Sequence, residues 1–149
     1  MPLQFRNVEA SPDDEVATWP YEALVTAIDR GLVPDWQPIF AEIRRAPWGT
    51  TARRIESYLT WREPDGVSTL FALAVEAARD RTAEAERAEV AARVRSAVAR
   101  SGLTSARFAR EIGTSASRLS TYATGTVVPS ASLLLRIERA AASGPRSAR

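Results

Sequence analysis

The chain has 149 residues, of which 45% are hydrophobic, and a formal net charge of +2. This length suits one compact domain or two small ones, and the apolar content can build a core, which excludes a disordered chain. Histidine and cysteine are both missing from the sequence, so the usual general base near neutral pH, the thiol nucleophile and the common zinc ligands are excluded.

The first 66 residues predict an irregular lead-in followed by three short helices. Proline and glycine mark the boundaries, because proline fits the first turn of a helix and glycine ends one. The expected elements are a lead-in over residues 1–17, a helix from Pro20 to Arg30, a second helix capped by Asp35, a third that starts at Thr50 or Thr51, and a turn over residues 63–66. The four tryptophans lie in this half, near predicted helix ends, and we expect them to pack in the core or at its boundary.

Residues 67–101 contain no proline or glycine and consist of strong helix formers. Apolar residues recur at helical spacing around Phe71 and again around Val94, with a charged, alanine-rich stretch over residues 79–89 between them. The sequence therefore favours one long helix. The alternative is two helices with a break near Thr82.

The last third of the chain predicts three more helices with clear start and stop residues. Thr104 is a good cap for the first, and Gly113 can supply the left-handed residue that ends it. Thr114 or Ser115 caps the second, and Gly125 ends it. The buried faces are expected to hold Phe108, Ala109 and Ile112 in the first helix, Leu119, Tyr122 and Ala123 in the second, and Leu133, Leu134, Ile137 and Ala141 in the last.

Charge is divided unevenly along the chain. Residues 1–89 hold 10 arginines and 16 acids, a balance of −6, whereas residues 90–149 hold 10 arginines and 2 acids, a balance of +8. This asymmetry indicates that the C-terminal part alone meets a polyanion. We therefore divide the chain into an acidic helical module, 1–82, and a DNA-binding module, 83–149.

The spacing of these landmarks resembles the Cro/cI-type (XRE) helix-turn-helix family. The residues that carry the resemblance are Gly102-Leu103-Thr104, Phe108-Ala109, Gly113-Thr114-Ser115, Leu119-Ser120, Tyr122, Gly125, Pro129-Ser130 and Leu134. The resemblance covers residues 88–142 and implies a lambda-repressor-like domain of five or so helices. Its third helix, about residues 115–124, would lie in the major groove, and its second would cross the DNA backbone. The expected fold is all-α, with an N-terminal helical module joined by a long helix to this domain.

The resemblance also implies which residues meet DNA. The base-facing residues would be Ala116, Ser117, Arg118 and Thr121, with Arg118 able to reach either a guanine edge or a phosphate. Contacts with the DNA backbone would come from Thr104, Ser105, Arg107, Arg110, Ser115, Thr124, Gly125 and Thr126. Many relatives carry long amide side chains where this chain has Ala116 and Ser117, which makes pairing of two copies more necessary.

These observations predict a sequence-specific, double-stranded DNA-binding transcriptional regulator, a repressor that acts as a homodimer. The alternative is an antitoxin that represses its own operon and binds a toxin protein through residues 1–82. An enzyme is disfavoured: its candidate carboxylates would be Asp13-Asp14-Glu15, which could cap an early helix, and Asp80 with Glu84 on a solvated helix face. We expect no cofactor, no metal and no membrane contact. A cytoplasmic location is expected because the sequence shows neither a signal-peptide pattern nor an apolar run of about 20 residues.

Overall fold

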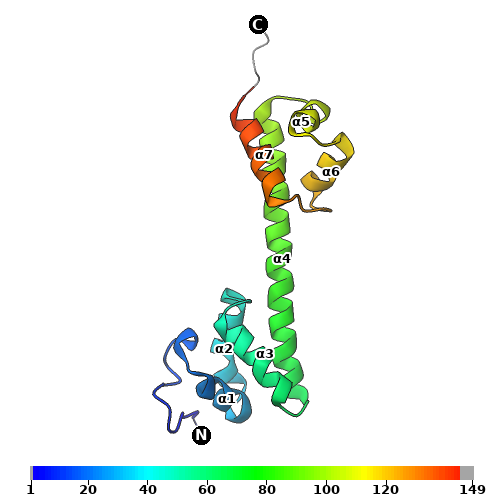
Figure 1. Ribbon diagram of the computed structural model, residues 1–149. Coiled ribbons are helices and arrows are strands. Elements are labelled where there is room, and N and C mark those ends of the chain that lie inside the picture. The colour runs from blue at the N-terminus through cyan, green and yellow to red at the C-terminus, as the bar shows by residue number, and fades with distance from the viewer. Residues whose placement is uncertain (1, 145–149) are drawn as a thin grey trace. The chain divides into compact units, whose positions relative to one another are not determined.

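A computed structural model describes residues 2–144 of the chain. These residues form seven α-helices and one short 3-10 helix, and no strand lies among them. The predicted all-α fold is confirmed. The elements in chain order are η1 (Val16–Thr18), α1 (Tyr21–Arg30), α2 (Val33–Arg45), α3 (Thr50–Trp61), α4 (Gly66–Ser101), α5 (Ser105–Ile112), α6 (Ala116–Thr124) and α7 (Ala131–Ala142) (Figure 1).

The chain divides into two compact units, Met1–Thr82 and Ala83–Arg149, which we call the N-terminal and C-terminal units. Helix α4 contributes its first half to one unit and its second half to the other. It has no break near Thr82, so the continuous helix is confirmed over the two split helices. Phe71, Val75 and Ala78 are buried in the first half, and Val94 and Ala97 are buried in the second. This spacing of three or four residues places each set on one side of the helix.

The core of the N-terminal unit lies where α1, α2 and α3 meet the first half of α4 (Figure 1). Aromatic side chains fill its centre: the ring of Trp36 meets Phe71 edge-on at 5.6 Å between centroids, and Phe40 packs against the same ring at 5.0 Å. The indole Nε1 of Trp36 donates a hydrogen bond of 2.8 Å to the carbonyl of Ala27. The indole thereby joins α1 and α2 and satisfies its polar atom inside the core.

Helix α2 begins earlier than the sequence predicted. The N-cap residue is Leu32, and the carboxylate of Asp35, in the first turn, accepts a 2.8 Å hydrogen bond from the Leu32 amide. The predicted cap at Asp35 was therefore wrong by three residues. The physical reason is Pro34, which fits the first turn of a helix because it has no amide hydrogen to satisfy there.

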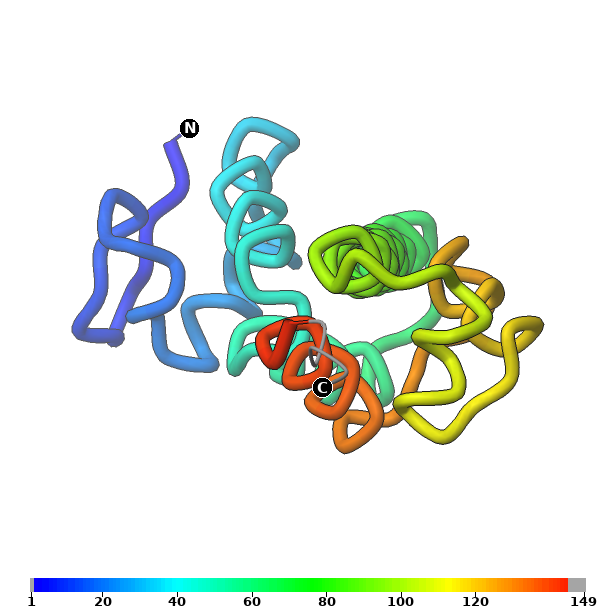
Figure 2. The backbone as a smooth tube through the Cα atoms, turned by 90° about the horizontal axis from the view of Figure 1, so that it is seen from above, coloured from blue at the N-terminus to red at the C-terminus, as the bar shows by residue number. Residues whose placement is uncertain are grey.

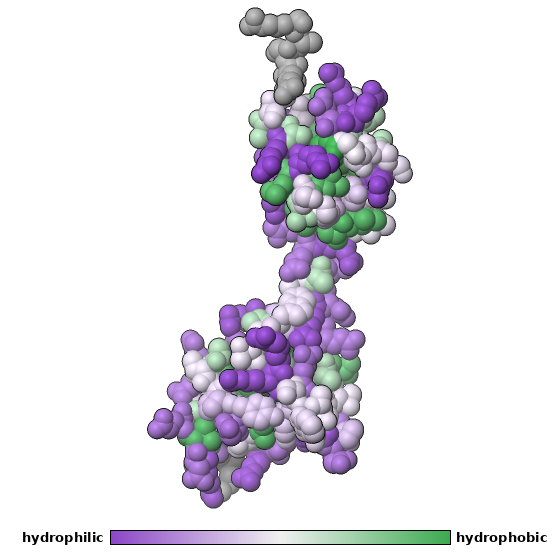
Figure 3. All heavy atoms as spheres, in the orientation of Figure 1, coloured by the Kyte–Doolittle hydropathy of each residue, from purple (hydrophilic) through white to green (hydrophobic). Residues whose placement is uncertain are grey.

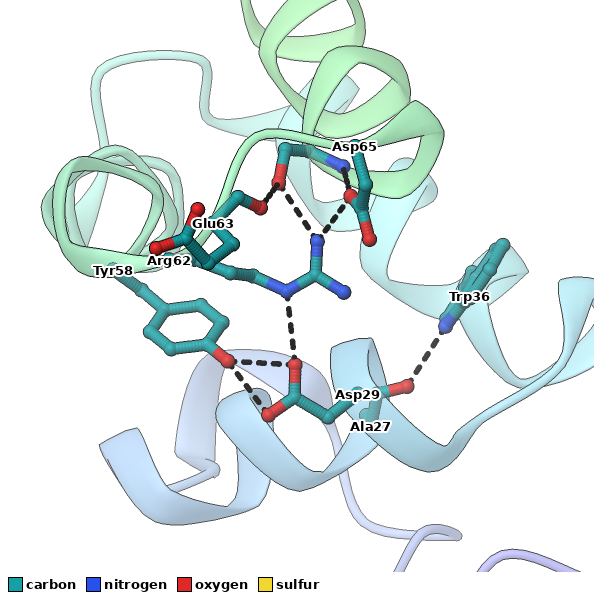
Figure 4. A network of polar contacts seen from close by, with 8 residues as sticks. Ala27, Asp29, Trp36, Tyr58, Arg62, Glu63 and Asp65 are labelled. Carbon is teal, nitrogen blue, oxygen red and sulfur yellow. Dashed lines mark hydrogen bonds and ion pairs between the residues drawn. The ribbon is translucent and has the colours of Figure 1, made fainter.

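A polar network joins three helices of the N-terminal unit (Figure 4). The guanidinium of Arg62, just after α3, contacts Asp29 of α1 at 3.0 Å, the carboxylate of Asp65, and Ser68 of α4 at 2.7 Å. The hydroxyl of Tyr58 donates to Asp29 at 2.6 Å. Burial, followed by the Asp29 carboxylate, raises the pKa of Tyr58 to about 12. The Ser68 amide, followed by Arg62, lowers the pKa of Asp65 to about 2.

The core of the C-terminal unit lies where α5, α6 and α7 meet the second half of α4 (Figures 1 and 2). Its buried side chains include Phe108 and Ile112 from α5, Leu119 from α6 and Ile137 from α7. The expected buried faces are confirmed, with Leu133, Leu134 and Ala123 partly buried at the edge. The implied count of five or so helices was too high: over residues 88–142 the structure has four, because the end of α4 serves as the first and an extended loop joins α6 to α7.

Within residues 2–144, none of the helices combines the length and the apolar character that crossing a membrane requires.

Candidate nucleic-acid interface

The starts of α5 and α6 are both capped by hydroxyl side chains. The Oγ1 of Thr104 accepts a 3.3 Å hydrogen bond from the Arg107 amide, and the Oγ of Ser115 accepts one of 3.1 Å from the Arg118 amide. Of the two caps predicted for α6, the structure selects Ser115 rather than Thr114. Each hydroxyl accepts from its helix and can still donate its own hydrogen. Both helix starts therefore suit a phosphate oxygen, which favours the positive end of a helix.

Gly113 sets the angle between α5 and α6. Its φ is +77°, the left-handed conformation that the sequence predicted, and it ends α5. The next amide, of Thr114, donates back to Ala109 at 2.9 Å. From α7, Nη1 of Arg136 donates to the carbonyl of Ile112 at 3.0 Å, so the last carbonyl of α5 gains a charged partner. These contacts fix a short turn between two capped helices, which is the arrangement of a helix-turn-helix.

Helix α6 has a buried side and an exposed side. Leu119 and Tyr122 are 2% and 7% exposed and point into the core. Positions three, four and seven residues after Ser117 share the opposite side of the helix. Ser117, Ser120 and Thr124 are exposed there, and Thr121 is half-buried. We call these four residues the α6 stripe.

The hydroxyls of the α6 stripe differ in what they bind. The Oγ1 of Thr121 donates to the carbonyl of Arg118 at 2.6 Å, and the Oγ1 of Thr124 contacts the Thr126 hydroxyl at 3.0 Å. Within residues 2–144, the hydroxyls of Ser117 and Ser120 make no hydrogen bond. The hydroxyls of the two serines are therefore free both to donate and to accept, whereas the hydroxyls of Thr121 and Thr124 already bond within the protein.

Two sets of arginines in the C-terminal unit differ in what their guanidinium groups contact. Three hold the scaffold: Arg93 pairs with Glu138 at 2.6 Å, Arg95 donates through Nη1 to the carbonyl of Ala123 at the end of α6, and Arg136 caps α5. Three others, Arg107, Arg110 and Arg118, are exposed, and no guanidinium contact joins them to any part of residues 2–144. The second group provides cations free to meet phosphates. Figure 3 shows hydrophilic side chains interspersed with hydrophobic ones on the visible face of this unit.

The loop after α6 packs against α4. Gly125 has a φ of +80°, and a Cβ atom at this position would lie 3.5 Å from the Cβ of Ala91. The Val127 amide donates to the carbonyl of Thr121 at 3.2 Å. Thr126 is exposed beside this contact. The loop therefore presents Thr126 from a fixed position next to the last turn of α6.

A surface cavity of about 420 Å³ brings together predicted site residues from two helices. Its lining includes Ser105 from α5 and Ala116, Ser120 and Ala123 from α6, with Arg95 and Val98 from α4. The sequence interpretation missed Ser120 and Arg95. Ser120 could have been found, because it lies one turn from Ser117 and Ala116. Arg95 could not, because only the packing of α4 against α6 places it there.

The acidic groups considered as catalytic candidates lie elsewhere. The carboxylate of Asp14 accepts a 2.8 Å hydrogen bond from the Ser11 amide, and Asp80 and Glu84 are exposed on α4. Glu15 is the N-cap residue of η1, but no side-chain hydrogen bond caps that helix. Across the described chain, 2–144, no three acidic residues gather closely enough to hold a metal ion.

Residues 89–146 match a family model described as a helix-turn-helix domain. The searches of curated proteins and of solved structures found no match to the chain. The matched segment covers the end of α4 from residue 89, and all of α5, α6 and α7, on which the caps, the Gly113 turn and the α6 stripe lie. The C-terminal unit therefore contains a helix-turn-helix domain, which indicates a DNA-binding protein.

Proposed function

We propose that this chain is a sequence-specific transcriptional regulator of the Cro/cI type that binds double-stranded DNA and represses transcription. Helix α6 enters the major groove, and α5 crosses the phosphate backbone. The protein acts by binding, with no catalytic step. The observation that carries the proposal is the exposed α6 stripe, which lies opposite buried Leu119 and Tyr122 and beside the capped start of α5.

The residues have distinct roles in this proposal. Ala116, Ser117, Thr121 and Arg118 lie on the helix that meets the bases. The backbone contacts come from the cap hydroxyls of Thr104 and Ser115, from Ser105, from exposed Arg107 and Arg110, and from Thr124, Gly125 and Thr126 in and after the last turn of α6. Contacts of this second kind position the protein but carry no sequence information.

A homodimer is part of the proposal. The exposed side of α6 is short and made of small residues, so one copy covers few base pairs. Two copies on a palindromic site would place two recognition helices about 34 Å apart, one turn of DNA. The N-terminal unit is proposed as the pairing element, because it is a separate compact unit with its own core.

Selection from a random DNA library with the full-length protein tests the function directly. We expect a palindromic motif whose half-sites are separated by one helical turn. Affinity should fall steeply as salt rises, because phosphate contacts release counterions. The matched control is a Ser117→Glu, Thr121→Glu variant, which keeps the buried side of α6 and places two negative charges against the DNA. If wild type and variant bind all DNA equally, the proposal is wrong.

The antitoxin function remains a second candidate, and exposed aromatic residues in the N-terminal unit favour it. Trp61 is 86% exposed and Trp48 is 49% exposed, so the expectation that all four tryptophans pack in or beside the core was wrong for these two. Tryptophan is enriched where proteins bind each other. The −6 balance of residues 1–89 would suit a basic partner.

Co-expression tests this candidate. A toxin encoded beside this chain should be neutralised by the wild-type protein and much less by Trp61→Ala. The Arg118→Ala variant, altered on α6, should neutralise as well as wild type. A neighbouring gene whose product does not impair growth would contradict the antitoxin function and leave the DNA-binding function standing.

A further inference from the structure

We infer that α6 recognises its DNA mainly through the methyl groups of thymine, and that Arg118 binds a phosphate rather than a base. The inference rests on the proposed function, because it assumes that the exposed side of α6 faces the major groove. It names the class of DNA that the site takes: half-sites rich in T·A pairs at the positions α6 covers.

The place of Arg118 on the helix is the first step. Arg118 lies one turn before Tyr122, so both side chains leave the helix on the same side. Tyr122 is 7% exposed and belongs to the core. Each residue turns the helix by about 100°, so Arg118 lies about 160° from Ser120 and about 100° from Ser117. The arginine therefore leaves from the flank of α6, where the sugar-phosphate backbone borders the groove.

The chemistry of the exposed side is the second step. Ala116 is exposed and carries only a methyl group. Thr121 is half-buried and donates its hydroxyl hydrogen to the Arg118 carbonyl at 2.6 Å, so the hydroxyl can only accept from a base, and the side chain also carries a methyl group. Thymine alone presents a methyl group in the major groove, and apolar contact with that group separates it from the other bases.

The serines add little discrimination of their own. Ser117 and Ser120 have free hydroxyls, and a hydroxyl can both donate and accept, so it can bond the edge of any base. The amide and guanidinium groups that form bidentate pairs with adenine or guanine do not occur on the α6 stripe. Arg95 borders the cavity beside Ala116, but its Nη1 is bonded to the carbonyl of Ala123. The remaining source of sequence preference is apolar contact with thymine.

Deoxyuridine is the probe that isolates this contact, because it pairs like thymidine and lacks only the methyl group. The selected motif is first determined with the full-length protein, and each thymidine in it is then replaced singly by deoxyuridine. We expect about a fourfold loss of affinity at each position that α6 contacts, as burial of one methyl group predicts. Unchanged affinity at every position would overturn the inference.

A protein variant combined with the deoxyuridine DNA completes a double-mutant cycle. Thr121→Ser keeps the hydroxyl and removes the methyl, so it should lose about fourfold on thymidine DNA and nothing further on DNA already substituted at the contacted position. Thr104→Ser is the matched control, since it keeps its cap and should show no such dependence on the base. Arg118→Ala should weaken binding by the same factor on every DNA sequence. It should also lower the slope of log affinity against log salt concentration by about one.

The outcomes separate the two claims. The selected motif could instead contain a guanine for which Arg118→Ala loses the preference at that one position. This result would overturn the inference and leave the DNA-binding function intact. Failure of the full-length protein to bind or select any DNA would refute the proposed function and this inference together.

Discussion

Arg62 should contribute measurably to the stability of the N-terminal unit. Its side chain is 16% exposed, and its guanidinium joins Asp29 of α1, Asp65 before α4 and Ser68 within α4. Hydrogen bonds to charged groups contribute about 1.5–3 kcal/mol each when buried. The two carboxylates are 39% and 48% exposed, so solvent screens much of this energy. We therefore expect Arg62→Ala to cost about 2 kcal/mol in total.

Arg45→Ala is the matched control. Arg45 makes two hydrogen bonds to a single carboxylate, that of Glu42, at 2.8 and 2.6 Å, and its side chain is 67% exposed. Solvent screens an exposed pair of this kind, so Arg45→Ala should cost much less than Arg62→Ala. The comparison therefore sets an arginine that joins two carboxylates from different segments against an exposed arginine that pairs with one carboxylate in its own helix.

Urea unfolding followed by tryptophan fluorescence measures both variants. All four tryptophans lie between residues 19 and 61, so the signal reports the N-terminal unit alone. Trp19 and Trp36 are buried and should dominate the change on unfolding. Equal losses for Arg62→Ala and Arg45→Ala would refute the reasoning, since they would mean that the network in Figure 4 adds nothing beyond an exposed ion pair.

Three further predictions concern both units. The pKa of Tyr58 is raised to about 12 in the folded protein, above the usual value near 10. Its contribution to the free energy of unfolding is therefore complete below about pH 10 and is lost as pH rises toward 12. Tyr58→Phe should flatten this pH dependence in fluorescence-monitored unfolding. Gly113→Ala should cost about 1–2 kcal/mol through its φ of +77°, since the nearest atom to a new Cβ is 3.7 Å away and no clash occurs; circular dichroism should show the loss while the tryptophan transition stays in place. Arg107→Ala and Arg110→Ala should each lower the salt slope of DNA binding by about one and leave the selected motif unchanged, whereas a changed motif would assign that residue to the bases.

Much of the C-terminal unit followed from sequence because its signals are local. A cap such as Thr104 acts on an amide three residues away, and Gly113 or Gly125 ends a helix through its own φ. Buried faces follow from the helical period, which is why Phe108, Ile112 and Leu119 were predicted as core residues. The position of the helix-turn-helix could therefore be predicted from the sequence alone, whereas its contacts with DNA stay predictions.

Local signals failed where two of them compete. Asp35 is a good capping residue, but Pro34 allows α2 to start before it, and Asp35 then accepts the Leu32 amide from inside the first turn. The exposure of the tryptophan side chains also could not be predicted from their positions in the sequence. Trp36 and Trp61 both stand near helix ends in the sequence, yet one fills the core and the other is 86% exposed.

The amino-acid sequence by itself determined the helices, their stops and the excess of positive charge in the last 60 residues, since each depends on neighbours within about one turn or on composition. The tertiary structure alone decided which arginines remain free. Arg93, Arg95 and Arg136 look like Arg107 or Arg118 in the sequence, but they bind groups 24 to 45 residues away and hold the scaffold. Their partners are set by the angles at which the helices pack, and no spacing along the chain encodes those angles.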